Sequence, residues 1–142
     1  MGRKKVFVSF DWHNDKHYKF LLDAWHQNPE FEFEYFDVTP GEINSTNVER
    51  IKAGLSVKIR DASHTLFIVG KHANSPHALA RSIGFINWIN FEAYQSNYER
   101  NKLCVVKIED SNALPNELLS VRYSWITGFT EANVIAVLNH ST

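Results

Sequence analysis

One carboxylate, Glu92, has the setting of a group that does chemistry. It follows Trp88 by four positions, a spacing that places both residues on one face of a helix. On that face the indole ring could shield the acid from water or stack on a ligand, and a cationic heterocycle would be attracted by both groups. The competing interpretation is a core tryptophan beside a surface acid, which residue types alone make the commoner case.

The elements that must position Glu92 alternate between strand and helix. Continuous apolar runs predict buried strands at residues 6–10, 66–69 and 103–108. The alternating Phe-Glu-Phe-Glu-Tyr-Phe run at 31–36 predicts an edge strand, and a last short strand is expected at 123–127.

Four helical segments complete the pattern. Asp15 is a plausible N-cap for the first, the polar cluster at 44–47 offers caps for the second, and Thr130 caps the last. Between residues 71 and 100 we expect a short helical piece, an interruption near Gly84, and a longer helix from about Phe85.

Five alternations of strand and helix predict an α/β fold of the flavodoxin-like type. It has three layers around a five-stranded parallel sheet of order 2-1-3-4-5. Ligands bind such sheets where the strand order reverses, here between the first and third strands. The loops after Phe10 and Val69 then line one crevice, which brings Asp11, Trp12 and Glu92 toward one another.

Composition bounds the function. The 142 residues predict a single domain spanning 1–142, and a net charge of -1 provides no field for nucleic acid or an anionic membrane surface. One cysteine and no long apolar segment favour a cytoplasmic protein. No metal site is predicted, because His13 and His17 lack a third ligand. A glycine-rich phosphate loop is absent after the first strand.

Several segments together resemble the TIR and TIR-like domains, most closely the bacterial TIR-like family of the Thoeris antiphage protein ThsB. The segment at 88–92 has the tryptophan–glutamate spacing that carries the catalytic glutamate in these families. The resemblance covers about residues 5–138, and the link from Gly70 to Trp88 is longer than in typical TIR domains. The matching segments are Val-Phe-Val-Ser-Phe at 6–10, Phe-Asp at 36–37, residues 51–59, Ser-His-Thr-Leu-Phe-Ile-Val-Gly at 63–70, and Trp-Ile-Asn-Phe-Glu at 88–92.

The resemblance implies an enzyme that cleaves NAD as its substrate, with no other cofactor, releasing nicotinamide and leaving ADP-ribose or a cyclised derivative. Glu92 then corresponds to the catalytic acid, Phe10 and Asp37 to pocket residues, and Trp88 to the residue that packs the glutamate's helix. The product would activate a separate effector protein after phage infection. Self-association into a homo-oligomer is left open.

Two alternatives stand beside this one. TIR-like domains also act without catalysis, as interaction modules. Nucleoside deoxyribosyltransferases are similar α/β proteins in which a glutamate acts at the anomeric carbon of a sugar. Both alternatives are compatible with the predicted fold.

Overall fold

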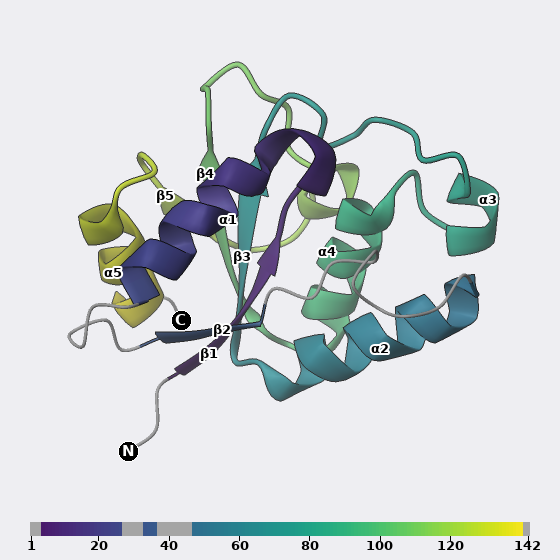
Figure 1. The fold of residues 1–142 in the computed structure, drawn as a ribbon, viewed down its shortest axis with the longest axis horizontal. Helices are drawn as coiled ribbons and strands as arrows, with labels where there is room; N and C mark the ends of the chain where they lie inside the picture. Colours follow the sequence, from purple (N-terminus) through teal and green to yellow (C-terminus); the bar gives the residue numbers. More distant parts are fainter. Residues whose placement is uncertain (1–3, 27–32, 37–46, 141–142) are drawn as a thin grey trace.

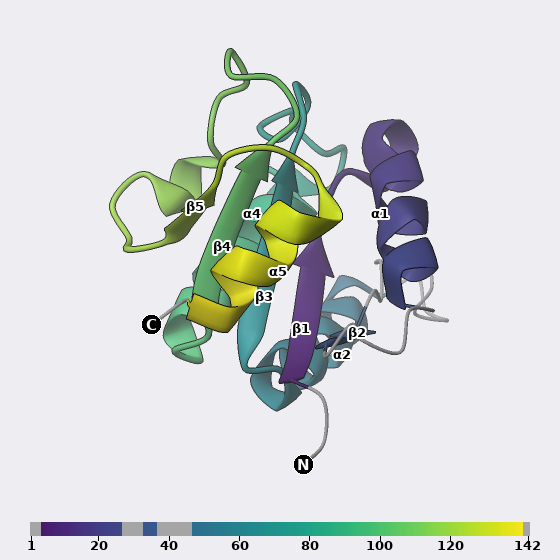
Figure 2. The same cartoon turned by 90° about the vertical axis from the view of Figure 1, so that its left-hand side faces the viewer.

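The computed structural model describes residues 4–26, 33–36 and 47–140. These form a parallel sheet of five strands in the order β2-β1-β3-β4-β5, which confirms the predicted fold. In Figure 2 the long central strands run upward side by side. The strands are β1 (Lys4–Ser9), β2 (Phe33–Phe36), β3 (His64–Val69), β4 (Lys102–Lys107) and β5 (Ser124–Ile126).

Helices cover both faces of the sheet. Figures 1 and 2 show α1 and α5 on one face, with α2 and α4 on the other. Every crossover is right-handed, but the chain moves toward one side of the sheet from β1 to β2 and toward the other side afterwards, which places helices on both faces. The helices are α1 (Trp12–His26), α2 (Val48–Asp61), α3 (Ala80–Ile83), α4 (Trp88–Tyr98) and α5 (Glu131–His140), with a 3-10 helix, η2 (Asn116–Leu118).

Alternation along β1 divides the core between the two faces. Val6, Val8 and Phe10 pack with residues of α1 and α5, including Leu22. Phe7 packs instead with apolar residues of α2 and α4. The next residue on that second face is Ser9, which is therefore directed toward the α4 layer.

Helix ends follow the local chemistry of the sequence. The Asn47 side chain accepts hydrogen bonds from the backbone N–H groups of Glu49 and Arg50, so this residue caps α2. Gly84 ends α3 with φ +85°, a conformation that suits glycine. Thr130 Oγ1 accepts from the N–H of Asn133 at 3.2 Å, so the predicted cap of α5 is confirmed.

The predicted start of the first helix is wrong. The helix begins at Trp12, and the Asp11 carbonyl oxygen accepts from the N–H groups of Asn14 at 3.3 Å and Asp15 at 2.7 Å. Asp15 therefore lies inside the first turn and its side chain is available for another role. The long helix predicted from about Phe85 begins three residues later, at Trp88, after the expected short piece.

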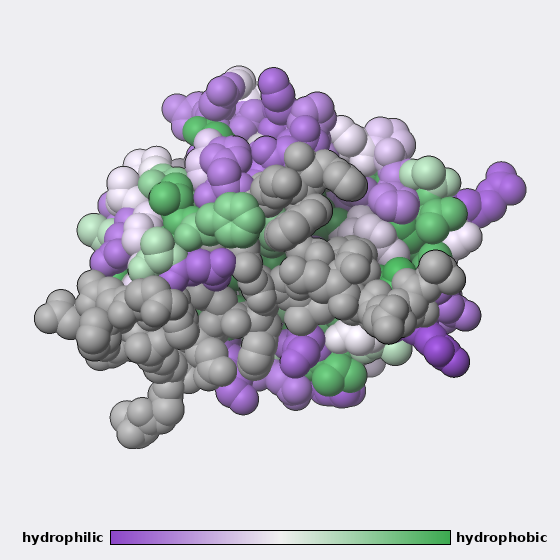
Figure 3. All heavy atoms as spheres, viewed as in Figure 1, coloured by the Kyte–Doolittle hydropathy of each residue, from purple (hydrophilic) through white to green (hydrophobic). Residues whose placement is uncertain are grey.

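Hydrophilic side chains are unevenly distributed over the surface of the molecule. Hydrophilic side chains gather at the upper end of the view in Figure 3, the end at which β1, β3 and β4 leave the sheet. Among the described residues, no helix has the length and apolar character needed to cross a bilayer.

Candidate active site

Glu92 is buried at the interface between α4 and the end of β1. Its side chain is 3% exposed, so the interpretation of Glu92 as a surface acid is wrong. Ser9, the last residue of β1, is 1% exposed and donates its hydroxyl hydrogen to Glu92 Oε1 at 2.7 Å. The two residues are far apart in the sequence, and the parallel sheet brings them together.

Burial changes the acidity of this carboxyl group. Desolvation raises the pKa of Glu92 from its ordinary value of 4.5 to about 8, because a buried charge loses its hydration. The hydrogen bond from Ser9 acts in the opposite direction and lowers the pKa, since the hydroxyl stabilises the charged form. A group with such a pKa changes its protonation near neutral pH, as acid–base catalysts do.

An asparagine network fixes the beginning of α4, the helix that carries Glu92. The Asn87 side-chain oxygen caps the helix by accepting from the N–H of Asn90 at 3.0 Å. The Asn87 amide also donates to the carbonyl oxygens of Ala73 and Ser75, at 2.8 and 3.0 Å. Asn90 in turn donates to Asn74 Oδ1 at 3.1 Å. The segment after β3 is thus tied to the helix.

Two further contacts hold α4 in place. Glu117, in η2, donates its N–H to Asn90 Oδ1 at 3.0 Å. Toward the other end of the helix, Thr65 of β3 donates to Ser96 Oγ at 2.8 Å, and both side chains are fully buried. A helix held at both ends offers its carboxyl group in a defined position, which catalysis requires.

The other predicted site residues are in different environments. Trp88 is 9% exposed and packs edge-on against Phe91, with ring centroids 5.9 Å apart. Phe10 is buried on the opposite face of the sheet from Ser9, in the core beneath α1. Asp11 Oδ2 accepts from Asn14 Nδ2 at 2.7 Å, so this residue takes part in starting α1.

Two predicted site residues cannot be placed in full. The backbone of Trp12 forms the first residue of α1, while its side chain is outside what the structure describes. Asp37 lies outside the described residues. Ser9 and Glu92 are therefore the groups that the structure joins directly, and Ser9 was not a predicted site residue.

Sequence reasoning overlooked Ser9 and Asp15. Ser9 is the single polar residue in the apolar run at 6–10, and that exception was the signal available. Asp15 is a second buried carboxyl group, 8% exposed, which the sequence presented only as a helix cap. Acidic side chains are seldom buried without a reason, so Asp15 merits a functional explanation, as does Ser9 through its hydrogen bond to the buried Glu92.

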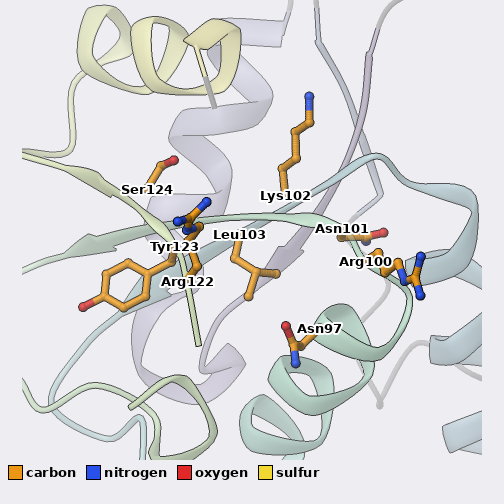
Figure 4. A pocket seen from close by; sticks show the side chains of 8 residues that line it. All are labelled: Asn97, Arg100, Asn101, Lys102, Leu103, Arg122, Tyr123 and Ser124. Atoms are coloured by element: carbon orange, nitrogen blue, oxygen red, sulfur yellow. The ribbon is translucent and has the colours of Figure 1, made fainter. Parts of the chain in front are cut away.

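A hollow of about 580 Å³ lies at the opposite edge of the sheet, beside the first residues of β4 and β5. Figure 4 shows the side chains of Lys102 and Leu103 on opposite sides of β4, as the alternation of a strand requires. Arg100 and Arg122 stand on either side of Leu103 in that view. These cationic groups do not converge on one point, and Glu92 is not among the lining residues.

The structure also bears on metal binding. Among the described residues, no three His, Cys, Asp or Glu side chains come together in a way that could hold a metal ion.

The strand order and the helices on both faces define an α/β protein of the flavodoxin-like type. The family model of the TIR-like domain of Thoeris protein ThsB matches residues 7–113, so the chain belongs to that family. The match runs from within β1 through β4 and includes Ser9 and Glu92. No curated protein matches the chain.

Solved structures with the same fold come from two kinds of protein. A prokaryotic SEFIR domain is 16% identical with a TM-score of 0.54, covering 96% of this chain and 94% of that one. A 2-deoxyribosyltransferase from Leishmania mexicana is 12% identical with a TM-score of 0.59, covering 96% and 98%. A 2-deoxyribosyltransferase from Bacillus psychrosaccharolyticus is 14% identical with a TM-score of 0.55, covering 91% and 90%. At these identities the likeness shows the fold alone.

Proposed function

We propose that this chain is a TIR-type enzyme that cleaves NAD at the bond between nicotinamide and ribose. The product would be an ADP-ribose-derived signal, cyclic in the form we favour, which activates an effector protein in antiphage defence. The observation that carries the proposal is the buried Ser9–Glu92 pair in a chain of this family. The substrate would be NAD itself, with no additional cofactor.

The chemistry needs only one carboxylate. The nicotinamide of NAD is already cationic, so when the bond from C1′ to the ring nitrogen breaks, the electron pair neutralises the leaving group. No general acid is required, in contrast to ordinary glycosides, which use two carboxyl groups. The positive charge that develops on the ribose is stabilised by the Glu92 carboxylate, and this interaction is strongest in the transition state. The oxygen of water or of a substrate hydroxyl then bonds to C1′ and gives its proton to the Glu92 carboxylate, or a ring nitrogen of the substrate bonds to C1′ through its lone pair.

Burial suits this role. In the free protein the raised pKa of Glu92, about 8, keeps most of the carboxyl group neutral at pH 7. A cationic nicotinamide brought close to it in a medium of low polarity favours the ionised form. Binding of NAD would therefore generate the carboxylate where it is needed. Ser9 would hold Oε1 in position through its 2.7 Å hydrogen bond.

The same burial places a condition on activity. At 3% exposure, the carboxyl group can meet a sugar only after neighbouring groups move. An enzyme at rest would therefore turn over slowly until a trigger or a partner opens the site. Assays should include lysate from phage-exposed cells as a source of such a trigger.

The decisive experiment is chromatography of NAD incubated with the wild-type chain and with Glu92→Gln. We expect nicotinamide release by the wild type and a loss of at least about a thousandfold in the variant, because the developing charge loses its counter-charge. Arg122→Ala, at the distant hollow, serves as the control and should retain its activity. Equal turnover by the wild type and Glu92→Gln would refute the catalytic role.

A second candidate is N-deoxyribosyl transfer between bases. The observation in its favour is the fold shared with two 2-deoxyribosyltransferases over more than nine-tenths of the chain. Glu92 would again act at an anomeric carbon. Incubation with 2′-deoxynucleosides and free bases separates the two reactions, since base exchange without NAD cleavage would favour the transferase. Absence of both reactions, even with a trigger, would favour an interaction module.

A further inference from the structure

Asp15 is a buried acid with one carboxylate oxygen that the described residues leave without a hydrogen bond. Its side chain is 8% exposed, and among the described residues Oδ2 is fully enclosed and accepts no hydrogen bond. Leaving a buried polar atom unsatisfied costs about 1–3 kcal/mol, and more for a charged group. Such an atom calls for an explanation, and a group from outside the protein that completes its hydrogen bonding is one.

The chain makes room for this carboxyl group at Gly70, the residue that follows β3. A Cβ atom at position 70 would lie 2.2 Å from Asp15 Oδ2 and 2.7 Å from Asp15 Cγ, far inside van der Waals contact. Any side chain there would push the carboxyl group away. Glycine leaves this space to the carboxyl group, so Asp15 lies directly against the end of β3.

This location belongs to the same edge of the sheet as Glu92. Ser9, which binds Glu92, pairs in register with Phe67, and Gly70 lies three residues further along β3. At a rise of about 3.3 Å per residue and a strand spacing of about 4.8 Å, Gly70 and Ser9 are roughly 11 Å apart. The site at which strand order reverses, between β1 and β3, is thus flanked by Glu92 from α4 and Asp15 from α1.

The surroundings of Asp15 contain both signs of charge. Burial raises the pKa of its carboxyl group, and so does the nearby Asp11 carboxylate. His17, His72 and Lys71 act in the opposite direction and lower that pKa. Interactions of this kind favour the ionised form of a buried carboxyl group.

We propose that Asp15 is a second substrate-binding carboxylate of this site and accepts a hydrogen bond from a ribose hydroxyl of the dinucleotide. This inference rests on the proposed function. A carboxylate is a suitable acceptor because a ribose hydroxyl donates readily to it, as in dinucleotide-binding sites of other α/β folds. Glu92 adjoins Ser9 and Asp15 adjoins Gly70, two backbone positions roughly 11 Å apart, so Glu92 can act at one part of the dinucleotide while Asp15 holds another. The hydroxyl belongs to either the nicotinamide ribose or the adenosine ribose.

The test measures NAD affinity by calorimetry in a Glu92→Gln background, in which NAD stays intact. We expect Asp15→Ala to weaken NAD binding by ten- to a hundredfold, the range for hydrogen bonds to charged groups. One NAD analogue lacks the hydroxyl that donates to Asp15, and it should bind to Glu92→Gln as weakly as NAD binds to the double variant Asp15→Ala/Glu92→Gln. The double variant should bind NAD and that analogue with equal affinity. The analogue that behaves in this way identifies the ribose.

A second pair of variants covers the case in which Asp15→Ala fails to fold. Gly70→Ala should displace the carboxyl group and weaken NAD binding, whereas Gly128→Ala should have no effect. At position 128 a Cβ atom would meet only Asn133 Nδ2, at an ordinary 3.6 Å. Asp15→Asn keeps the shape and should retain the unfolding temperature while losing affinity.

The outcomes separate this inference from the function on which it rests. If the wild type cleaves NAD and every Asp15 and Gly70 variant keeps its affinity and KM, Asp15 is not a substrate ligand and the proposed function survives. If removing a ribose hydroxyl from NAD weakens binding by the same factor in proteins with and without Asp15, Asp15 is again not a substrate ligand and the proposed function survives. A wild-type chain that binds no NAD, with or without a trigger, overturns both.

Discussion

The two edges of the sheet hold opposite kinds of polar group. At the edge where β1 and β3 end, Ser9, Asp15 and Glu92 are buried, and the two acids have raised pKa values. At the opposite edge, Arg100, Lys102 and Arg122 surround an open hollow and are exposed to water. Among the described residues, none of these three cations forms an ion pair or a side-chain hydrogen bond.

The contrast shows that an open cavity and the side chains best suited to catalysis can lie in different places. Exposed cations keep their hydration, so the fold spends little free energy on holding them. A buried carboxyl group costs free energy that packing elsewhere must offset, and such a cost is commonly met at functional sites. The tightly packed edge is therefore the better candidate for the active site, although the hollow is easier to see.

The largest effect expected from this difference is a change of stability with pH at the acidic edge. Native Glu92 binds its proton more tightly than the unfolded chain does, so its contribution is complete below pH 4.5 and is lost as the pH rises to about 8. The loss should be on the order of 4 kcal/mol. Denaturant unfolding of the wild type and Glu92→Gln from pH 5 to 9 measures it, and the variant should be much less sensitive.

The pKa of Asp15 is also raised, so Asp15 likewise lowers the free energy of unfolding as the pH rises. Glu92→Gln should retain this smaller pH dependence. A wild type whose stability is flat or rises between pH 5 and 8 would contradict the buried neutral acid. Arg122→Ala, at the basic edge, is the matched control and should keep the full dependence.

A smaller effect is expected when the partner of Glu92 is removed. The Ser9 hydroxyl lowers the pKa of Glu92, so Ser9→Ala should move the pH midpoint of kcat/KM for NAD cleavage upward. Loss of one charge-assisted hydrogen bond should also reduce kcat/KM at pH 7 by about tenfold. The pH–rate profiles of the wild type and Ser9→Ala give both quantities. A midpoint that stays in place, or moves down, would mean that the hydroxyl does not stabilise the carboxylate.

The smallest effect is expected at the basic edge. Arg100 has φ +62°, the only positive value among the described residues other than glycine. Arg100→Gly should relieve about 1 kcal/mol of backbone strain, and the greater freedom of glycine in the unfolded chain offsets most of this gain. Thermal unfolding should therefore change by a few degrees at most, with NAD turnover unchanged. A loss of turnover would show that this edge takes part in function.

Local signals in the sequence were enough to predict the fold. The apolar runs gave the buried strands, the alternation at 31–36 gave the edge strand, and the order of strands followed from the handedness of crossovers. The polar cluster at 44–47, the interruption near Gly84 and the cap at Thr130 were recognised because a helix end depends on neighbours within a few residues, and the structure shows that Asn47 is the member of the cluster that caps α2. The first helix was misplaced because Asp11 and Asp15 are both suitable caps, and only the backbone hydrogen bonds decide between them.

The site was predicted less completely. The spacing from Trp88 to Glu92 identified the acid, while its burial and its bond to Ser9 were not foreseeable from that spacing. Ser9 and Glu92 are 83 positions apart, and whether a helical acid faces water or the sheet depends on how the helix is rotated in the finished fold. In α4 the polar residues Asn90, Glu92 and Ser96 are buried while the aromatic residues Tyr94 and Tyr98 are exposed, so the helix lacks the amphipathic pattern that would normally reveal that rotation.

The sequence by itself determined which residues form strands and helices, their order in the sheet and the family to which the chain belongs. Hydrophobic periodicity and helix capping act over short stretches of chain, the handedness of crossovers gives the strand order, and the family follows from the resemblance of several short segments to its members. Only the tertiary structure decided that Ser9 meets Glu92, and that Asp15 is enclosed against Gly70 with one oxygen unpartnered. Desolvation and long-range hydrogen bonding depend on what surrounds a group in space, and those surroundings exist only after the chain has folded.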